Sequence, residues 1–239
     1  MSRHSRIRVP LAPTALALAA LALPALAAGQ NPEVGERVDA LRQSLQKSSQ
    51  ALKQYEWIET TAVSLKGDEK ARLQKRCYHG ADGTLQKVPV GEAPPKGRKK
   101  RGVRGRVAEK KKGELTEYMQ RAVDLVQAYV PPDPGRIQRA RDTGKAAVHV
   151  LEPGKRVRLD FEDYEKPGDT LGVEMDLTNN RLLALTVASY LDSPDDSVGL
   201  KVGFSTLADG SSYASDIALD VPAKNLAVAV QNSGYKKIH

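Results

Sequence analysis

The sequence holds a single cysteine, Cys77, among its 239 residues. One thiol cannot form a disulfide within the chain, so disulfide cross-links are excluded as a source of stability. The fold must depend instead on the burial of apolar side chains. We expect Cys77 itself to be a small buried residue on a strand.

Long apolar stretches are missing from all but the first 27 residues, where the pattern is that of an export signal. The apolar segment Leu16–Leu23 is too short to span a bilayer as a helix. Arginines precede it and a small-x-small sequence follows it: Arg3, Arg6, Arg8 and Ala25-Leu26-Ala27. This order is typical of a cleavable signal peptide. We expect residues 1–27 to be removed and residues 28–239 to form one soluble, periplasmic domain.

Groups arranged for metal or covalent chemistry are scarce as well. The later histidines, His79, His149 and His239, have no cysteine or acidic neighbours at metal-ligand spacing. Cys77 and His79 share one face of a strand, as a thiolate pair would, but a buried structural cysteine is the commoner arrangement. No nucleophile-elbow motif is found. We therefore expect no catalytic residues, no metal and no cofactor.

Two segments have the apolar spacing of amphipathic helices. The first begins at Asn31-Pro32-Glu33, an N-cap followed by proline and an acid, and continues to Leu52. Its apolar residues recur at three-, four- and seven-residue intervals: Val34, Val38, Leu41, Leu45 and Leu52. The second has the same spacing from Leu115 to Tyr129. Each helix needs an apolar surface to cover.

Two runs rich in β-branched and aromatic residues, 55–66 and 69–79, are predicted to form a hairpin around Gly67-Asp68. Closure at that turn fixes four cross-strand pairs: Trp57/Tyr78 and Glu59/Arg76 on the outer side, Ile58/Cys77 and Ala62/Leu73 on the inner side. Aromatic and opposite-charge pairs add up to about 1 kcal/mol each. They favour this register over a one-residue slip.

The last quarter of the chain alternates apolar and polar residues at period two, which puts its large aliphatic side chains on one side of an antiparallel sheet. With the earlier strands there are about ten, and a sheet of that size twists and curls. The predicted fold is α+β, a strongly curved antiparallel half-barrel wrapped around the long N-terminal helix and the mid-chain helix. A flat sandwich would bury the same residues, but it would give the two amphipathic helices no apolar surface to cover.

The order of elements resembles the outer-membrane lipoprotein carrier and receptor superfamily of the LolA and LolB type. The closing segment resembles that superfamily's last hairpin: Phe204-x-x-Leu207-x-Asp209-Gly210-x-x-Tyr213-x-x-x-Ile217-x-Leu219. The resemblance implies a half-barrel whose cavity takes lipid acyl chains or an extended partner.

A carrier of this kind would bind a lipid acyl chain, a lipoprotein or another hydrophobic ligand without catalysis. The candidate cavity-lining residues come from the first helix and the last strands: Leu41, Leu45, Val202, Phe204, Ile217, Leu219, Val228 and Val230. The same residues would equally serve as an ordinary core, because buried strand faces need no ligand.

Residues 92–112 form a strongly basic segment, which is expected to be an exposed, mobile insertion. It supports a second hypothesis, an interaction or sensor module with a closed core that binds acidic partners or an anionic membrane surface. No aromatic residue is interleaved to stack on bases, so no nucleic acid partner is expected. The segment could also be a solvated loop that binds no partner. The sequence does not indicate the oligomeric state. The basic candidates are Lys96, Arg98, Lys99, Lys100, Arg101, Arg104, Arg106, Lys110, Lys111 and Lys112.

Overall fold

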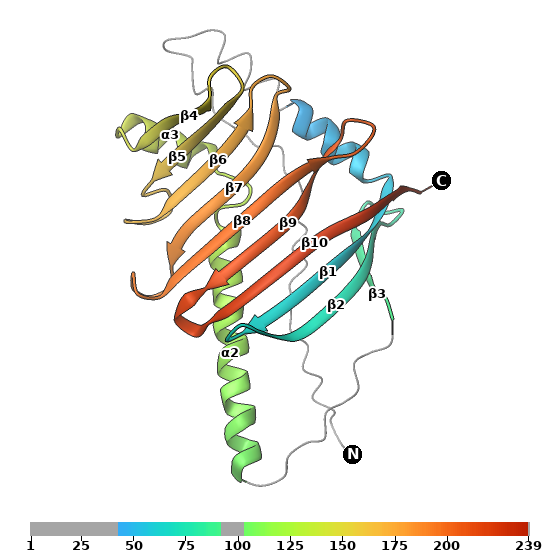
Figure 1. Cartoon of the computed structure of the whole chain (residues 1–239), viewed down its shortest axis with the longest axis vertical. Helices are drawn as coiled ribbons and strands as arrows, with labels where there is room; N and C mark the ends of the chain where they lie inside the picture. Colours follow the sequence, from blue (N-terminus) through green and yellow to red (C-terminus); the bar gives the residue numbers. More distant parts are fainter. Residues whose placement is uncertain (1–42, 92–102, 239) are drawn as a thin grey trace.

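The computed structural model describes residues 43–91 and 103–238, and its main element is one ten-stranded antiparallel sheet. The strands are β1 (Tyr55–Leu65), β2 (Asp68–His79), β3 (Leu85–Pro89), β4 (Ala146–Glu152), β5 (Arg156–Glu162), β6 (Thr170–Asp176), β7 (Arg181–Tyr190), β8 (Ser197–Thr206), β9 (Ser212–Val221) and β10 (Leu226–Lys237). Their order across the sheet is β3-β2-β1-β10-β9-β8-β7-β6-β5-β4. The first and last strands of the chain therefore lie side by side within the sheet (Figure 1).

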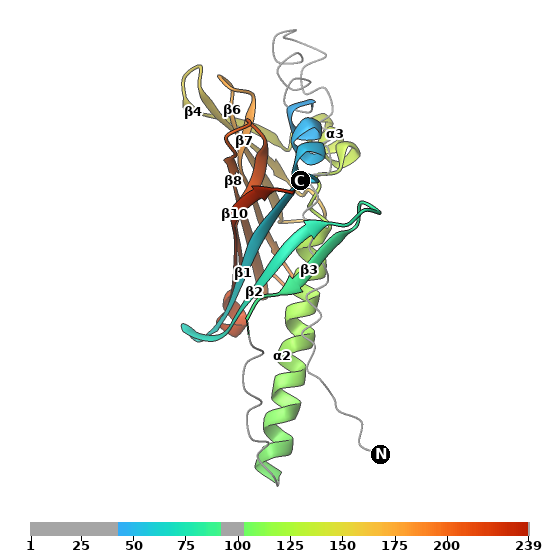
Figure 2. The ribbon, with the colours of Figure 1, turned by 90° about the vertical axis from the view of Figure 1, so that its right-hand side faces the viewer.

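The three α-helices lie on one side of this sheet (Figure 2). They are residues 43–52, α2 (Val103–Gln127) and α3 (Pro134–Asp142), with a short 3-10 helix, η1 (Pro222–Lys224), before β10. Figure 2 shows the sheet nearly edge-on, with its β1–β3 end curving toward α2. The predicted α+β fold with a curved antiparallel sheet wrapped on helices is confirmed.

The core fills the space between the concave face of the sheet and α2. Met119, Ala122 and Val126 recur at three- and four-residue spacing along α2 and are buried, as the predicted apolar stripe requires. They pack into a cluster with the inward side chains of the six strands β5–β10, which include Leu159, Leu171, Leu185, Val202, Leu219 and Val228. Burial of each large aliphatic side chain contributes about 1.5–3 kcal/mol, so this cluster is the main source of stability.

The mid-chain helix begins earlier than the sequence indicates. The apolar spacing starts at Leu115, but α2 starts at Val103, so the last part of the predicted insertion is helical. Arginine and lysine are good helix formers even without an apolar stripe, which explains the extension. In Figures 1 and 2 the first turns of α2 project beyond the sheet. Residues 92–102, with the first five basic candidates, lie outside the described residues, as do residues 1–42 with the predicted signal peptide and Leu41.

The register of the first hairpin differs from the prediction by one residue. Lys66 and Gly67, both with positive φ (56° and 82°), form the tight turn, and Leu65 pairs with Asp68. A bulge then shifts the ladder between Val63 and Ser64. The four predicted pairs are wrong, and the observed ones are Trp57/Cys77, Ile58/Arg76, Glu59/Lys75, Thr61/Leu73 and Ala62/Arg72. Trp57 and Glu59 therefore face the concave side, which Ile58 and Ala62 do not.

Candidate functional site

The structure brings the described lining candidates together on the concave face. Leu45, Val202, Leu219 and Val228 are between 0% and 7% exposed and belong to one apolar cluster. The other three are only partly buried and pack against that cluster: Phe204, Ile217 and Val230. The seven described candidates therefore share the concave face. That they line a ligand cavity stays a prediction.

Four partly buried apolar residues lie on the neighbouring strands β8, β9, β10 and β1. Ile217 pairs with Val230 between β9 and β10, Phe204 stands on β8, and Val63 on β1 is also partly buried against the cluster. Ile217 and Val230 have fully buried partners on their other sides, Val202 on β8 and Thr61 on β1. These four side chains are therefore apolar groups of the concave face that stay partly exposed beside a buried cluster. We name Val63, Phe204, Ile217 and Val230 the apolar row.

Aromatic rings gather beyond the apolar row, where β1 meets β10. The ring of Tyr235 stacks on Trp57, with centroids 5.4 Å apart and planes 10° apart. It also contacts Tyr213 and Tyr55, with centroids at 4.4 Å and 6.3 Å. Aromatic pairs of this kind add about 0.5–1.5 kcal/mol beyond area burial. We name Tyr55, Trp57, Tyr213 and Tyr235 the aromatic corner.

An ion pair lies beside the aromatic corner on the same face. Lys87 Nζ is 2.5 Å from Glu59 Oε2, and the two side chains are only 12% and 11% exposed. Burial raises the pKa of the adjacent Cys77 thiol to about 11, with the Glu59 charge as a second cause. Cys77 is therefore a protonated thiol at neutral pH and is unsuited to nucleophilic chemistry. Burial, and then the Lys53 charge, lowers the pKa of His79, which favours the neutral imidazole.

Two polar atoms in this region are buried without a hydrogen-bond partner. They are Nδ1 of His79, whose ring lies 6.0 Å from that of Trp57, and Oδ1 of Asn232, whose amide nitrogen donates to Ala214 O. An unsatisfied buried polar atom costs about 1–3 kcal/mol. Both atoms are covered by protein, so the fold bears this cost.

Polar contacts hold α2 over the other half of the sheet. Arg121 pairs with Asp192 at 2.5 Å, and Tyr118 donates to Asp196 in the same loop between β7 and β8. Burial, and then the Asp196 contact, raises the pKa of Tyr118 to about 12. Two residues beyond the end of the helix, Tyr129 donates to the buried Asp169. The C-terminal half of α2 is therefore fixed on the sheet rather than free to swing.

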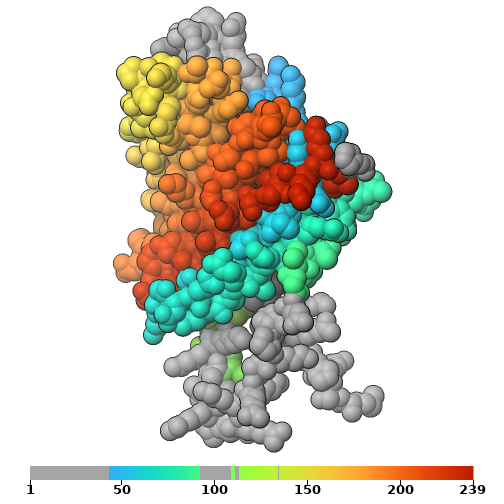
Figure 3. Space-filling model, turned by 45° about the vertical axis from the view of Figure 1, so that its right-hand side comes forward, coloured from blue at the N-terminus to red at the C-terminus, as the bar shows by residue number. Residues whose placement is uncertain are grey.

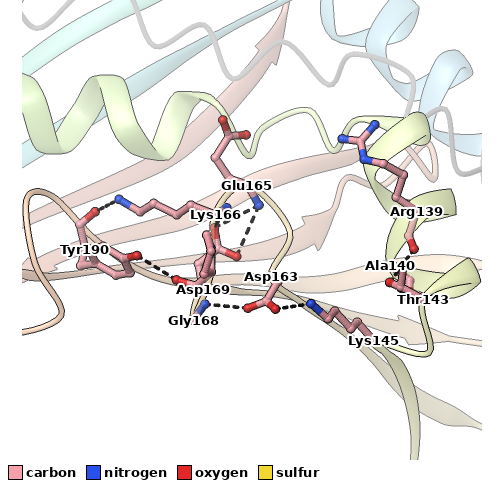
Figure 4. Close-up of polar contacts among 11 residues, drawn as sticks. Arg139, Ala140, Thr143, Lys145, Asp163, Glu165, Lys166, Gly168, Asp169 and Tyr190 are labelled. Atoms are coloured by element: carbon pink, nitrogen blue, oxygen red, sulfur yellow. Dashed lines mark hydrogen bonds and ion pairs between the residues drawn. The ribbon is translucent and has the colours of Figure 1, made fainter.

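The loop between β5 and β6 contains a second cluster of charged groups (Figure 4). The carboxylate of Asp169 accepts from the backbone N–H groups of Glu165 and Lys166 as well as from Tyr129. Lys145 pairs with Asp163 at 2.5 Å. Each of these carboxylates is occupied by structural donors. The cluster joins the loop to the segments that follow α2 and α3.

Other kinds of site are not supported by the described residues. Within residues 43–91 and 103–238, no group of three or more His, Cys, Asp or Glu side chains is placed to hold a metal ion. In the same part of the chain, none of the helices combines the length and the apolarity needed to cross a membrane. The basic candidates from Arg104 onward lie on α2, away from the aromatic corner, and Lys110 is exposed.

Comparison with known proteins gives likenesses of fold only. No family model matches the chain, and no curated protein matches it. A solved structure of a LolA superfamily protein from Nitrosomonas europaea aligns with a TM-score of 0.33 and 11% identity, over 81% of this chain and 93% of that one. A DUF1329 family protein from Desulfovibrio piger aligns with a TM-score of 0.36 and 7% identity, over 84% and 93%. The first is from the superfamily that the sequence resembles.

Proposed function

We propose that the protein is an exported, periplasmic carrier that binds a hydrophobic ligand with an acyl chain, such as a lipid or lipoprotein, without catalysis. The apolar row carries the proposal. Its four side chains lie on neighbouring strands of a concave sheet, and they remain partly exposed although the adjoining cluster is fully buried.

The aromatic corner supports a ligand that has a polar end. An acyl chain would lie along the apolar row, and the polar end would reach the ring edges of the aromatic corner. Rings with a polar edge suit the boundary between an apolar chain and its polar group. The protein would hold the ligand by burial, with a few hydrogen bonds to orient it.

A displacement titration tests this proposal. The fluorescent probe N-phenyl-1-naphthylamine should brighten on binding the purified protein, and oleate should displace it. Because Trp57 is the only tryptophan, its emission should shift as oleate binds. Absence of both signals would contradict the proposal.

Substitutions on the two faces of the sheet provide the control. Ile217→Ser removes an apolar contact from the apolar row and should weaken oleate binding about tenfold. Val88→Ser changes a residue that pairs with Arg76 on the opposite face and should leave binding unchanged. Equal effects of the two substitutions would show that the probe does not report the concave face.

A second candidate function is binding to an anionic membrane surface through α2. The projecting turns of α2 favour it, because Arg104, Arg106 and Lys110–Lys112 all lie on this part of the helix (Figures 1 and 2). Each basic group near an anionic surface contributes about 1 kcal/mol. Sedimentation with vesicles of phosphatidylglycerol should pull down the protein, and vesicles of phosphatidylcholine should not. Binding that does not weaken as salt is raised would contradict an electrostatic mechanism.

A further inference from the structure

The sheet has two edges, and they are protected to different degrees. An edge strand presents unpaired N–H and C=O groups that can pair with another strand, unless proline, charge or short length prevents it. β3 is protected in all three ways, since it is five residues long, ends at Pro89 and directs Lys87 inward to Glu59. β4 runs for seven residues, Ala146–Glu152, and contains neither proline nor lysine. It lies at the margin of the molecule in Figures 1 and 3.

β4 also leaves large apolar side chains in water. Val148 and Val150 are 63% and 62% exposed, more than any other large apolar side chain in the described part of the chain, and Leu151 is 46% exposed. Val148 pairs with Leu159, and Val150 with Val157, so both valines extend the concave face past its last covered strand. This strand combines an open edge with apolar side chains, which together favour addition of another strand.

The backbone of β4 shows which groups are open. Glu162 N donates to Lys145 O at 2.9 Å, so the Lys145/Glu162 pair is hydrogen-bonded. Bonded and non-bonded pairs alternate along an antiparallel ladder. The N–H and C=O groups of Ala146, Val148 and Val150 therefore point away from β5, toward the open edge. A bulge between Val150 and Glu152 ends this regular stretch.

We propose that β4 pairs antiparallel with β4 of a second copy of this chain, across a two-fold axis at Val148. The three open residues are symmetric about Val148, so Ala146 of one copy meets Val150 of the other, and Val148 meets its equivalent. All three open positions are then hydrogen-bonded in both copies. The two concave faces become continuous, and the exposed valines cover one another.

Charge at the two ends of β4 favours a second copy over an unrelated strand. Lys145 precedes the strand and Glu152 ends it, with His149 the remaining ionisable residue between them. In the proposed register Lys145 of each copy lies opposite Leu151 of the other, one residue from Glu152, while within each copy Lys145 also pairs with Asp163 and Glu152 with Lys155. Opposite charges at both ends favour the antiparallel orientation of the pair.

Sedimentation velocity on the purified full chain tests the interface. The wild type should show a concentration-dependent monomer–dimer equilibrium. Val150→Lys, which puts a charge on the open edge, should give monomer at concentrations where the wild type is dimeric. Val88→Lys makes the same change on β3, where the side chain is 42% exposed, and should leave the dimer intact. A monomeric wild type, or dimerisation unaffected by Val150→Lys, would overturn the proposal.

Cysteine cross-linking tests the register. In the proposed pair, the two copies of residue 148 have Cα atoms about 5.5 Å apart, within disulfide range. The two copies of residue 150 are offset by four residues, about 13 Å along the strand. Val148→Cys should therefore give a covalent dimer on mild oxidation, and Val150→Cys should give none. The native Cys77 is fully buried and serves as an internal control. Cross-linking at 150 rather than at 148, or at neither position, would overturn the proposed axis.

Discussion

Lys87 and Glu59, on strands separated by β2, form an ion pair on the concave face with an Nζ–Oε2 distance of 2.5 Å. Neither residue has a charged neighbour in the sequence that would indicate this contact. It exists because the hairpin turns at Lys66-Gly67 and directs Glu59 inward. The pair lies on the same face as the aromatic corner, next to the buried Cys77.

Removing one partner of this pair should be strongly destabilising. Lys87→Met leaves the Glu59 carboxylate buried with its opposite charge removed, which costs about 3–5 kcal/mol in comparable sites. The double variant Glu59→Gln/Lys87→Met removes both charges and should recover most of that loss. Urea unfolding of the wild type, the single variant and the double variant measures these differences in the free energy of unfolding. A loss below about 1 kcal/mol for the single variant would mean that water reaches the pair.

A glycine at the centre of β6 should not tolerate a side chain. A Cβ on Gly172 would meet Thr186 Oγ1 and would stand 2.8 Å from Asp160 Oδ1. Overpacking of this kind costs about 1–3 kcal/mol, so Gly172→Ala should lower the urea midpoint. At Gly199, the nearest atom to an added Cβ is Val187 O at 3.9 Å, and Gly199→Ala should be nearly neutral. Equal effects of the two substitutions would contradict the close approach of Thr186 and Asp160 to Gly172.

The Cys77 thiol should stay protonated and unreactive while the protein is folded. Its pKa is raised to about 11, so the folded chain keeps a proton that the unfolded chain releases near its ordinary pKa of 9.0. Stability due to the protonated thiol is therefore full below pH 9 and is lost as pH rises toward 11. Relative to Cys77→Ala, the wild type should lose stability across that range. Iodoacetamide labelling at pH 8 should proceed only on unfolding, and rapid labelling of the native protein would contradict this prediction.

The opposite pH dependence is expected at Asp209. The hydrogen bond from Tyr55, and then that from the Ser211 backbone, lowers the pKa of this carboxyl below its ordinary 3.8. Its contribution is present above that value and is lost as pH falls through the lowered pKa. The difference in melting temperature between wild type and Asp209→Asn should thus shrink as pH falls below 3.8. Tyr55→Phe should remove part of this pH dependence, because it removes the hydrogen bond to Asp209. A melting-temperature difference that does not change with pH would contradict the lowered pKa of Asp209.

Alternating residues made most of the sheet predictable, because period-two alternation specifies which side chains share a face. Register was harder to predict. The true turn, Lys66-Gly67, lies one residue before the expected one, and the bulge after Val63 leaves no sequence signal. The aromatic corner was also missed, since it unites residues 55 and 57 with 213 and 235, which only the β1–β10 pairing brings together.

Native mass spectrometry of the protein purified without detergent from its own host tests the central claim most directly. The account predicts a species heavier than the chain by one acyl-bearing molecule, and its fraction should fall in the Ile217→Ser variant but not in Val88→Ser. A mass equal to that of the polypeptide alone, in every preparation, would contradict a carrier function for the concave face.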